Sequence, residues 1–214
     1  MKDKRTVDMQ VMRDWVKPGS RVLDLGCGRG VLLDYLKSKL GVEAVGVDLD
    51  SDKVRACVKR GLSVYMGDMM DFMRAFPDKH FDYVVCSRTL QELKQPATVI
   101  REALRVSDQM LVGFVNFAYW RNRVSMLLKG HRIRNEVYPT RWWDNRPSNP
   151  LSVGQFDRFC DERGVRVERR LCLAGNWRTP VRVLPNLFCG YALYALSEGR
   201  LKAAKSEASG QASA

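Results

Sequence analysis

Residues 22–30 read VLDLGCGRG, an apolar strand that leads into glycines at positions 26, 28 and 30. Glycine has no Cβ atom, so the backbone can turn sharply there and approach a ligand closely. The apolar run that follows, VLLDYL at residues 31–36, predicts a helix. A strand, a glycine-rich turn and a helix in this order are typical of a nucleotide site in an α/β fold, although glycines also serve plain tight turns.

The spacing of the glycines distinguishes between two kinds of nucleotide site. A dinucleotide fingerprint, G-x-G-x-x-G, needs a glycine at position 31, where this chain has Val31. The pattern Asp-x-Gly-x-Gly-x-Gly that begins at Asp24 instead resembles the first motif of class I S-adenosylmethionine (SAM) methyltransferases. That resemblance implies a turn that holds the methionine end of SAM.

Two further carboxylates follow the next two expected strands. Residues 44–48, AVGVD, form a short apolar segment that ends in Asp48. An ionised carboxylate at this place can accept hydrogen bonds from both hydroxyls of a ribose. Asp68 follows the strand expected at residues 62–66, and in the SAM-binding family the acid at this position takes the adenine amino group while the next residue packs on the ring. The alternative interpretation of Asp68 is an N-cap for a helix over residues 69–73.

The resemblance to class I methyltransferases therefore implies SAM, or its product S-adenosylhomocysteine, as the bound cofactor. The expected cofactor-binding residues are Asp24, Gly26, Cys27, Gly28, Gly30, Asp48, Leu49, Asp68, Met69 and Ser87.

Strand and helix signals alternate along the chain, which predicts a mostly parallel sheet covered on both faces. Strands are expected at residues 20–25, 43–48, 62–66, 81–86, 109–115, 165–173 and 191–196, and helices at 30–40, 51–60, 96–106 and 153–163. The expected fold is α/β, a Rossmann-like class I methyltransferase fold with a mostly parallel seven-stranded sheet and a C-terminal antiparallel hairpin. We expect one domain over residues 1–197, with an irregular basic and aromatic insert at 117–150 and a disordered tail at 198–214.

Composition limits the classes of function. The chain has 214 residues, enough for one well-buried domain, and no apolar run approaches the roughly 20 residues that span a bilayer. The N-terminus is charged, without the apolar core of a secretory signal. Six scattered cysteines form no C-x-x-C pair, which argues against a zinc site or a disulfide framework. We therefore expect reduced thiols, no metal site, no membrane association and a cytoplasmic protein.

The positive charge of the chain is concentrated in one segment. The formal net charge is +12, and residues 120–182 hold 14 Lys/Arg against 6 Asp/Glu, a net of +8. A basic patch can attract RNA, a phosphorylated substrate or an acidic protein. The plainer interpretation is a solvated face.

The insert carries a narrower resemblance. The segment NFAYWRNR at residues 116–123 directly follows the fifth expected strand, and with SRTLQ at 87–91, WWD at 142–144 and LPNL at 184–187 it resembles the MetW family of methionine-biosynthesis proteins. The likeness covers about residues 5–196. It implies a protein with the methyltransferase fold that acts with a homoserine O-acyltransferase. The chain departs from the family pattern at Asn149, where a histidine is usual, so a proton-shuttling role at that position is in doubt.

The sequence offers only two weak candidates for catalysis. Glu92 follows the fourth expected strand, where it can act as a base, although a glutamate on a helix face is commoner. Asn116 can line the acceptor side or can simply bridge loop backbone. Methyl transfer from a sulfonium depends mainly on positioning, so a missing acid–base pair does not exclude an enzyme. Three functions stay open: assistance or regulation of an acyltransferase, which we favour, a stand-alone methyltransferase on a small molecule or protein, and an RNA methyltransferase.

Overall fold

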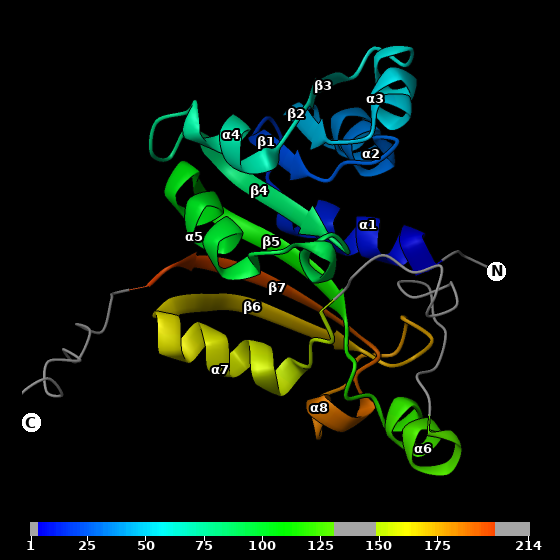
Figure 1. Cartoon of the computed structure of the whole chain (residues 1–214). Helices are drawn as coiled ribbons and strands as arrows, with labels where there is room; N and C mark the ends of the chain where they lie inside the picture. Colours follow the sequence, from blue (N-terminus) through cyan, green and yellow to red (C-terminus); the bar gives the residue numbers. More distant parts are fainter. Residues whose placement is uncertain (1–3, 131–148, 200–214) are drawn as a thin grey trace, which may run out of the picture.

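The computed structural model describes residues 4–130 and 149–199 of the chain (Figure 1). Its seven strands form one sheet in the order β3-β2-β1-β4-β5-β7-β6. The strands are β1 (Arg21–Leu25), β2 (Glu43–Asp48), β3 (Ser63–Met66), β4 (Phe81–Ser87), β5 (Ser107–Val115), β6 (Val165–Leu173) and β7 (Tyr191–Glu198). Strands β1 to β5 pair in parallel, whereas β7 is antiparallel to both β5 and β6. The predicted sheet with its C-terminal antiparallel hairpin is confirmed.

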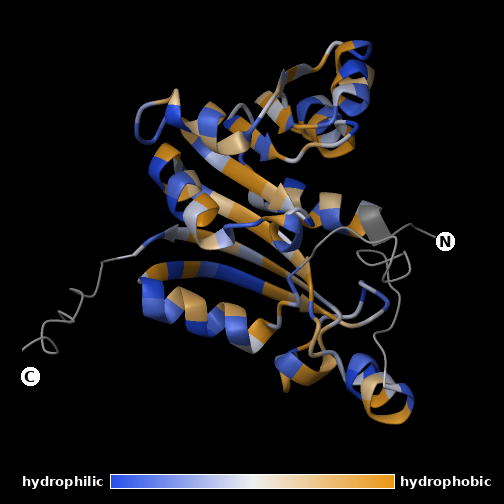
Figure 2. Ribbon diagram, in the orientation of Figure 1, coloured by the Kyte–Doolittle hydropathy of each residue, from blue (hydrophilic) through white to orange (hydrophobic). Residues whose placement is uncertain are grey.

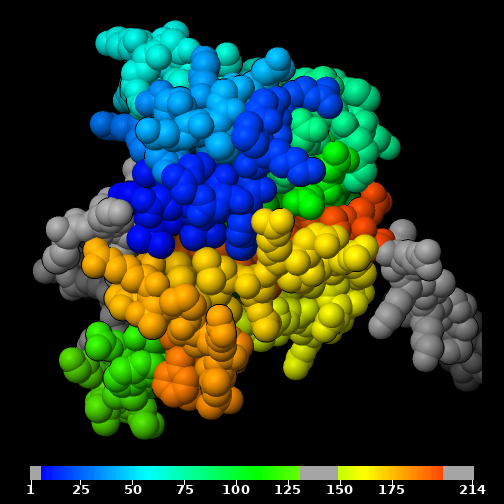
Figure 3. All heavy atoms as spheres, turned by 180° about the vertical axis from the view of Figure 1, so that it is seen from behind, coloured from blue at the N-terminus to red at the C-terminus, as the bar shows by residue number. Residues whose placement is uncertain are grey.

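Helices cover both faces of this sheet. One apolar cluster joins one face to α4 (Met69–Arg74), α5 (Pro96–Val106) and α7 (Val153–Arg163), and a second joins the other face to α1 (Lys4–Trp15) and α2 (Val31–Leu40). Figures 1 and 3 view these two layers from opposite sides. Helix α3 (Ser51–Val58) contributes Cys57 to a smaller cluster with α2. Short elements complete the described fold: the 3-10 turn η1 (Leu90–Glu92), α6 (Trp120–Lys129) and α8 (Pro185–Phe188).

Local sequence signals explain where the helices begin and end. Pro96 starts α5, where its missing N–H costs nothing. A capping box starts α7, since the Ser152 hydroxyl accepts from the Gln155 N–H while the Gln155 side chain accepts from the Ser152 N–H. The hydropathy colouring of Figure 2 shows apolar residues gathered along the central strands, in line with the burial of β4 and β5.

Some boundaries differ from those expected. Helix α1 was not predicted, β5 begins two residues earlier than Gln109, and α3 ends at Val58 instead of residue 60. Strand β7 continues through Glu198, which pairs with Val165, so this residue belongs to the sheet and not to a tail. Within the expected insert, residues 120–129 form the regular helix α6. Residues 131–148 and the expected tail from 200 onwards lie outside the described residues.

All six cysteines are buried, and none forms a disulfide. Burial raises the pKa of the Cys160 thiol to about 12, and it also raises the pKa values of the Cys27 and Cys86 thiols.

These buried thiols make stability fall in alkali. An unfolded thiol releases its proton near pH 8.5, whereas the folded thiols hold theirs. Because the unfolded state then binds fewer protons, the free energy of unfolding should be flat from pH 6 to 8 and fall above about pH 8.5. Urea unfolding at a series of pH values measures this, and Cys86→Ala should make the fall shallower. A free energy of unfolding that stays constant to pH 10 would contradict the prediction.

Candidate functional site

The glycine-rich turn joins β1 to α2 at the carboxyl end of the parallel strands. Gly26, Gly28 and Gly30 all adopt left-handed backbone conformations, with φ of 71°, 58° and 66°. The N–H groups of Gly26 and Cys27 donate to the carbonyl of Val47 at 2.8 and 3.0 Å. The turn is therefore fixed to the end of β2, and L-residues other than glycine would be strained at these three positions.

The three glycines differ in what surrounds them. A Cβ atom at Gly26 would lie 2.6 Å from the Thr89 side chain, and one at Gly30 would lie 2.6 Å from Leu62 and 2.9 Å from Cys57. A Cβ atom at Gly28 would meet nothing within 4 Å. Gly26 and Gly30 are thus required by packing, whereas Gly28 leaves a backbone surface open to a ligand.

Asp48 connects the turn to the end of β2. Its Oδ2 accepts from the Gly28 N–H at 2.8 Å and its Oδ1 accepts from the Asp50 N–H at 3.0 Å. Lys53 Nζ lies 3.9 Å from Oδ1. Each carboxylate oxygen has a second lone pair, so these contacts leave capacity for the two hydroxyls of a ribose.

We predict that Asp48→Ala weakens SAM binding by about 1–3 kcal/mol, because hydrogen bonds to a charged acceptor and the tether to Gly28 are lost together. Calorimetric titration with SAM measures the change. Asp52→Ala is the matched control, because Asp52 lies nearby on α3 with its side chain 87% exposed. An unchanged dissociation constant for Asp48→Ala would rule out Asp48 as the ribose ligand.

Four of the remaining expected cofactor residues are Asp68, Leu49, Met69 and Cys27. Asp68 is the N-cap of α4, since its Oδ1 accepts from the Met70 N–H at 2.7 Å. The N-cap interpretation is therefore confirmed for one carboxylate oxygen. Leu49, next to Asp48, is 72% exposed and offers apolar surface beside the turn, and Met69 packs partly against the core. The Cys27 side chain lies against Gly46, so only its backbone can face a ligand in the turn.

Asp24 is buried and Ser87 is half-buried. Asp24 is 4% exposed and lies between Gly46 of β2 and Val85 of β4. The Ser87 hydroxyl donates to Oδ2 of Asp8 on α1, a contact that the sequence did not predict.

Asp8, a residue of α1, is 2% exposed and lies at the centre of a polar cluster between this helix and the sheet. Its Oδ1 accepts from the Tyr191 hydroxyl at 3.0 Å and its Oδ2 lies 3.7 Å from Arg88 Nε. Burial, together with the Asp8 charge, raises the pKa of Tyr191, so this hydroxyl stays protonated. The signal in the sequence was an aspartate at the i−4 position from Met12, on the buried stripe of a helix.

The two catalytic candidates, Asn116 and Glu92, differ in burial. Asn116 is fully buried, and its side-chain Nδ2 donates to the carbonyls of Asn186 and Cys189 at 3.2 and 2.8 Å. Its Oδ1 accepts from the N–H groups of Ala118 and Val153, both at 3.2 Å. Backbone groups use the hydrogen-bonding capacity of Asn116, as expected from the alternative in which this residue bridges loop backbone.

Glu92 lies exposed in η1, next to a buried amide that positions this turn. Gln91 Oε1 accepts from the Val115 N–H at 3.0 Å, and its Nε2 donates to the Val115 carbonyl at 3.2 Å. The Asn149 N–H donates to the Gln91 carbonyl at 2.7 Å, and the Asn149 side chain donates to the Leu93 carbonyl at 2.8 Å. Asn149 thus connects its segment to η1 and Leu93 by hydrogen bonds, and these bonds need no titratable side chain.

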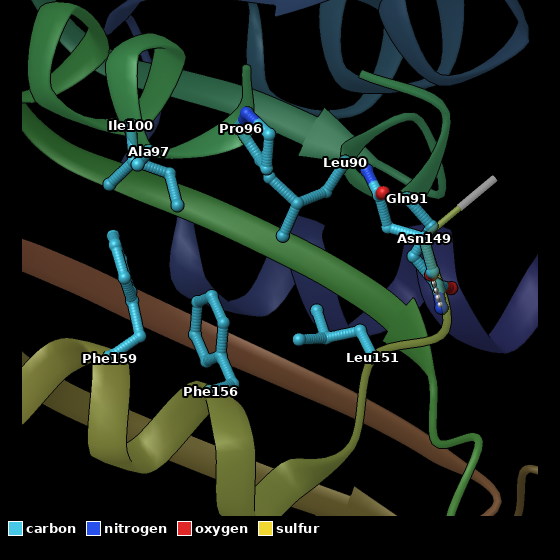
Figure 4. Close-up of a pocket in the computed structure, with 9 residues that line it drawn as sticks. All are labelled: Leu90, Gln91, Pro96, Ala97, Ile100, Asn149, Leu151, Phe156 and Phe159. Atoms are coloured by element: carbon cyan, nitrogen blue, oxygen red, sulfur yellow. Dashed lines mark hydrogen bonds between the residues drawn. The ribbon is translucent and has the colours of Figure 1, made fainter. Parts of the chain in front are cut away.

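A cavity of about 150 Å³ lies between α5, α7 and η1 (Figure 4). The side chains that line it are mainly apolar and include Leu90, Ile100, Leu151, Phe156 and Phe159. The amides of Gln91 and Asn149 lie at one end and are engaged in the hydrogen bonds given above. The described residues that line this cavity include no titratable side chain.

No group of three or more His, Cys, Asp or Glu side chains in residues 4–130 and 149–199 could hold a metal ion. None of the described helices is long and apolar enough to cross a bilayer.

Solved structures with this fold include both methyltransferases and a protein of another activity. A SAM-dependent methyltransferase from Archaeoglobus fulgidus matches 91% of this chain and 95% of its own, with a TM-score of 0.59 and 18% identity. The [4+2]-cyclase SpnF matches 92% of this chain and 81% of its own, with a TM-score of 0.65 and 18% identity. These likenesses show the fold alone, and a shared fold does not fix the reaction.

Curated relatives point to a narrower group. The bifunctional methionine biosynthesis protein MetXA/MetW of Rhodopirellula baltica is 31% identical over 188 residues, which are 76% of this chain and 30% of that protein. The ubiquinone biosynthesis O-methyltransferase of Proteus mirabilis is 26% identical over 82% of this chain and 74% of its own. The chain spans less than half the length of the first curated relatives that it matches. The family model described as "Methionine biosynthesis protein MetW" matches residues 6–196. This chain belongs to the MetW family.

Proposed function

We propose that this chain binds SAM at the glycine turn and acts in methionine biosynthesis by assisting or regulating a homoserine O-acyltransferase. The observation that carries the proposal is the match to the MetW family over residues 6–196. The R. baltica relative supports it, because its name joins MetXA and MetW in one polypeptide. Covalent joining raises the effective concentration of one module around the other, which benefits modules that work in contact.

The residues at the glycine turn fit SAM. The open surface at Gly28 can lie against the methionine part, the carboxylate of Asp48 has lone pairs for the ribose hydroxyls, and Leu49 offers apolar surface to the adenine. When bound, SAM supplies an activated methyl group or serves as an effector. Binding SAM, a product of the same pathway, suits a regulatory subunit.

A stand-alone methyltransferase is the second candidate. The intact glycine turn and the likeness to the P. mirabilis O-methyltransferase favour it. Against it stands the position of the two catalytic candidates, because Asn116 is fully buried among backbone partners and Glu92 is exposed in η1.

Reconstitution separates the two candidates. The homoserine O-acyltransferase encoded in the same genome is purified and assayed with and without this chain, at several SAM concentrations. We expect a complex and an acyltransferase rate that depends on the chain. No complex and no change in rate would contradict the proposal. Release of S-adenosylhomocysteine with an acceptor from a metabolite library would favour the methyltransferase instead.

A further inference from the structure

Helix α6 exposes a stripe of apolar side chains at one corner of the molecule. Trp120, Val124, Leu127 and Leu128 recur at i, i+4, i+7 and i+8, so they share one face. Their exposed fractions are 39%, 43%, 84% and 74%, and α6 contributes no buried residue to the described core. Two exposed leucines side by side on a helix are unusual for a surface that meets only water.

Cations flank this apolar stripe. At 100° per residue, Arg121 and Arg123 lie on opposite edges of it. The Arg123 Nε donates to the Ala118 carbonyl at 2.7 Å, and the Arg121 guanidinium lies 5.4 Å from the centre of the Trp120 ring. Residues 116–130 contain no Asp or Glu. The helix therefore presents an apolar centre with a basic rim.

The segment at α8 extends the same kind of surface. Val183, Leu184 and Phe188 are 72%, 61% and 43% exposed, and residues 174–190 contain Arg178 and Arg182 but no carboxylate. The hydrogen bond from Asn116 to the Asn186 carbonyl holds α8 beside the chain that leads into α6. Figures 1 and 3 show α6 and α8 at the same corner, away from the glycine turn.

We propose that α6, together with residues 183–188, is the surface on which the homoserine O-acyltransferase docks, and that the partner offers an apolar groove with a carboxylate rim. The inference rests on the proposed function and names the surface that serves it. An amphipathic helix with anchors at i, i+4 and i+7 is a recurring ligand for such grooves. The acidic rim follows from charge complementarity with residues 116–130 and 174–190, which contain cations and no carboxylate.

The charge also argues against a second copy of this chain as the occupant. In a symmetric dimer this surface would contact the same surface of the second copy, so Arg121 and Arg123 would face cations across the interface. The name of the R. baltica protein, by contrast, joins MetXA and MetW in one molecule, which supports a MetXA-type protein as the occupant.

The test uses the full chain and the acyltransferase encoded in the same genome. Leu127→Glu/Leu128→Glu removes the two most exposed anchors and adds charges that an acidic groove repels. Its dissociation constant for the acyltransferase should rise at least tenfold, about the effect of truncating one interface hot spot. Val58→Glu on α3 is the matched control, because Val58 is 59% exposed on another part of the chain. SAM binding and thermal unfolding should be the same in both variants and the wild type, because Leu127 and Leu128 are outside the described core.

Charge reversal gives a second, independent readout. Arg121→Glu/Arg123→Glu should slow association at low salt and remove most of its salt dependence.

The outcomes separate the inference from the proposed function. If the wild-type chain forms no complex with the acyltransferase, the proposed function fails. If the wild-type complex forms and Leu127→Glu/Leu128→Glu binds as tightly, only the docking surface is overturned. The docking surface is also overturned if this variant loses binding to phosphatidylserine vesicles, to RNA or to itself while the acyltransferase complex survives.

Discussion

Gly28→Val should abolish SAM binding while the chain stays folded. The turn leaves the Cβ position of Gly28 open, with no protein atom within 4 Å, so the new side chain projects from the backbone surface at which the cofactor is proposed to lie. The dissociation constant for SAM should rise by at least about 100-fold, because the methyl groups occupy the space of the ligand. Calorimetry measures the loss of binding, and circular dichroism measures the retained fold.

The cost of Gly28→Val to the fold is limited to the backbone. An L-residue at φ 58° costs about 1–2 kcal/mol. For a chain of 214 residues, this lowers Tm by roughly 2–8 °C.

Gly30→Val is the informative comparison, because it has a similar φ and a different environment. Its Cβ atom would lie within 3 Å of both Leu62 and Cys57, which are buried, so overpacking adds about 1–3 kcal/mol to the strain. Gly30→Val should therefore lower Tm more than Gly28→Val does. If Gly28→Val binds SAM with an unchanged dissociation constant, the cofactor does not lie against this turn.

These two glycines illustrate how far the sequence could predict the site. The order of strand, turn and helix is local, and the glycine spacing with Val31 separated a dinucleotide motif from the SAM motif without any tertiary information. The sequence could not distinguish Gly28 from Gly30, because that difference depends on Leu62 and Cys57, which are far along the chain.

Asn116 and Asp8 show the same limit for polar residues. Asn116 follows β5, which makes it a candidate in the sequence, yet its partners are backbone groups up to 73 residues away. Asp8 was missed because its partners, Ser87 and Tyr191, come from β4 and β7. The role of a buried polar group depends on partners that only the folded chain brings close, so a hydrophobic pattern alone cannot supply it.

Asp8→Ala should be among the most destabilising single substitutions in the chain. The substitution removes a buried carboxylate that accepts hydrogen bonds from Ser87 and Tyr191 and lies beside Arg88. These three residues then lose that partner. Breaking a buried ion pair by deleting one partner costs about 3–5 kcal/mol. At roughly 2–4 °C per kcal/mol, Tm should fall by about 6–20 °C.

Asp14→Ala is the matched control on the same helix. Asp14 pairs with Arg13, and its side chain is 59% exposed, so its loss should change the free energy of unfolding by less than about 0.5 kcal/mol. Urea unfolding of both variants measures the difference. Equal free energies of unfolding for Asp8→Ala and Asp14→Ala would show that the buried cluster does not hold α1 on the sheet.

The Asp8 cluster should also affect the cofactor site, through the loop that follows β4. Ser87 and Arg88 contact Asp8, and Thr89 in the same loop lies against Gly26 of the glycine turn. Arg88 itself holds a left-handed conformation with φ 62°, which a non-glycine residue keeps only when its surroundings fix it. Asp8→Ala should therefore weaken SAM binding even at temperatures where the variant is fully folded, whereas Asp14→Ala should not. A folded Asp8→Ala variant with the wild-type dissociation constant would show that the cluster stabilises the fold without positioning the turn.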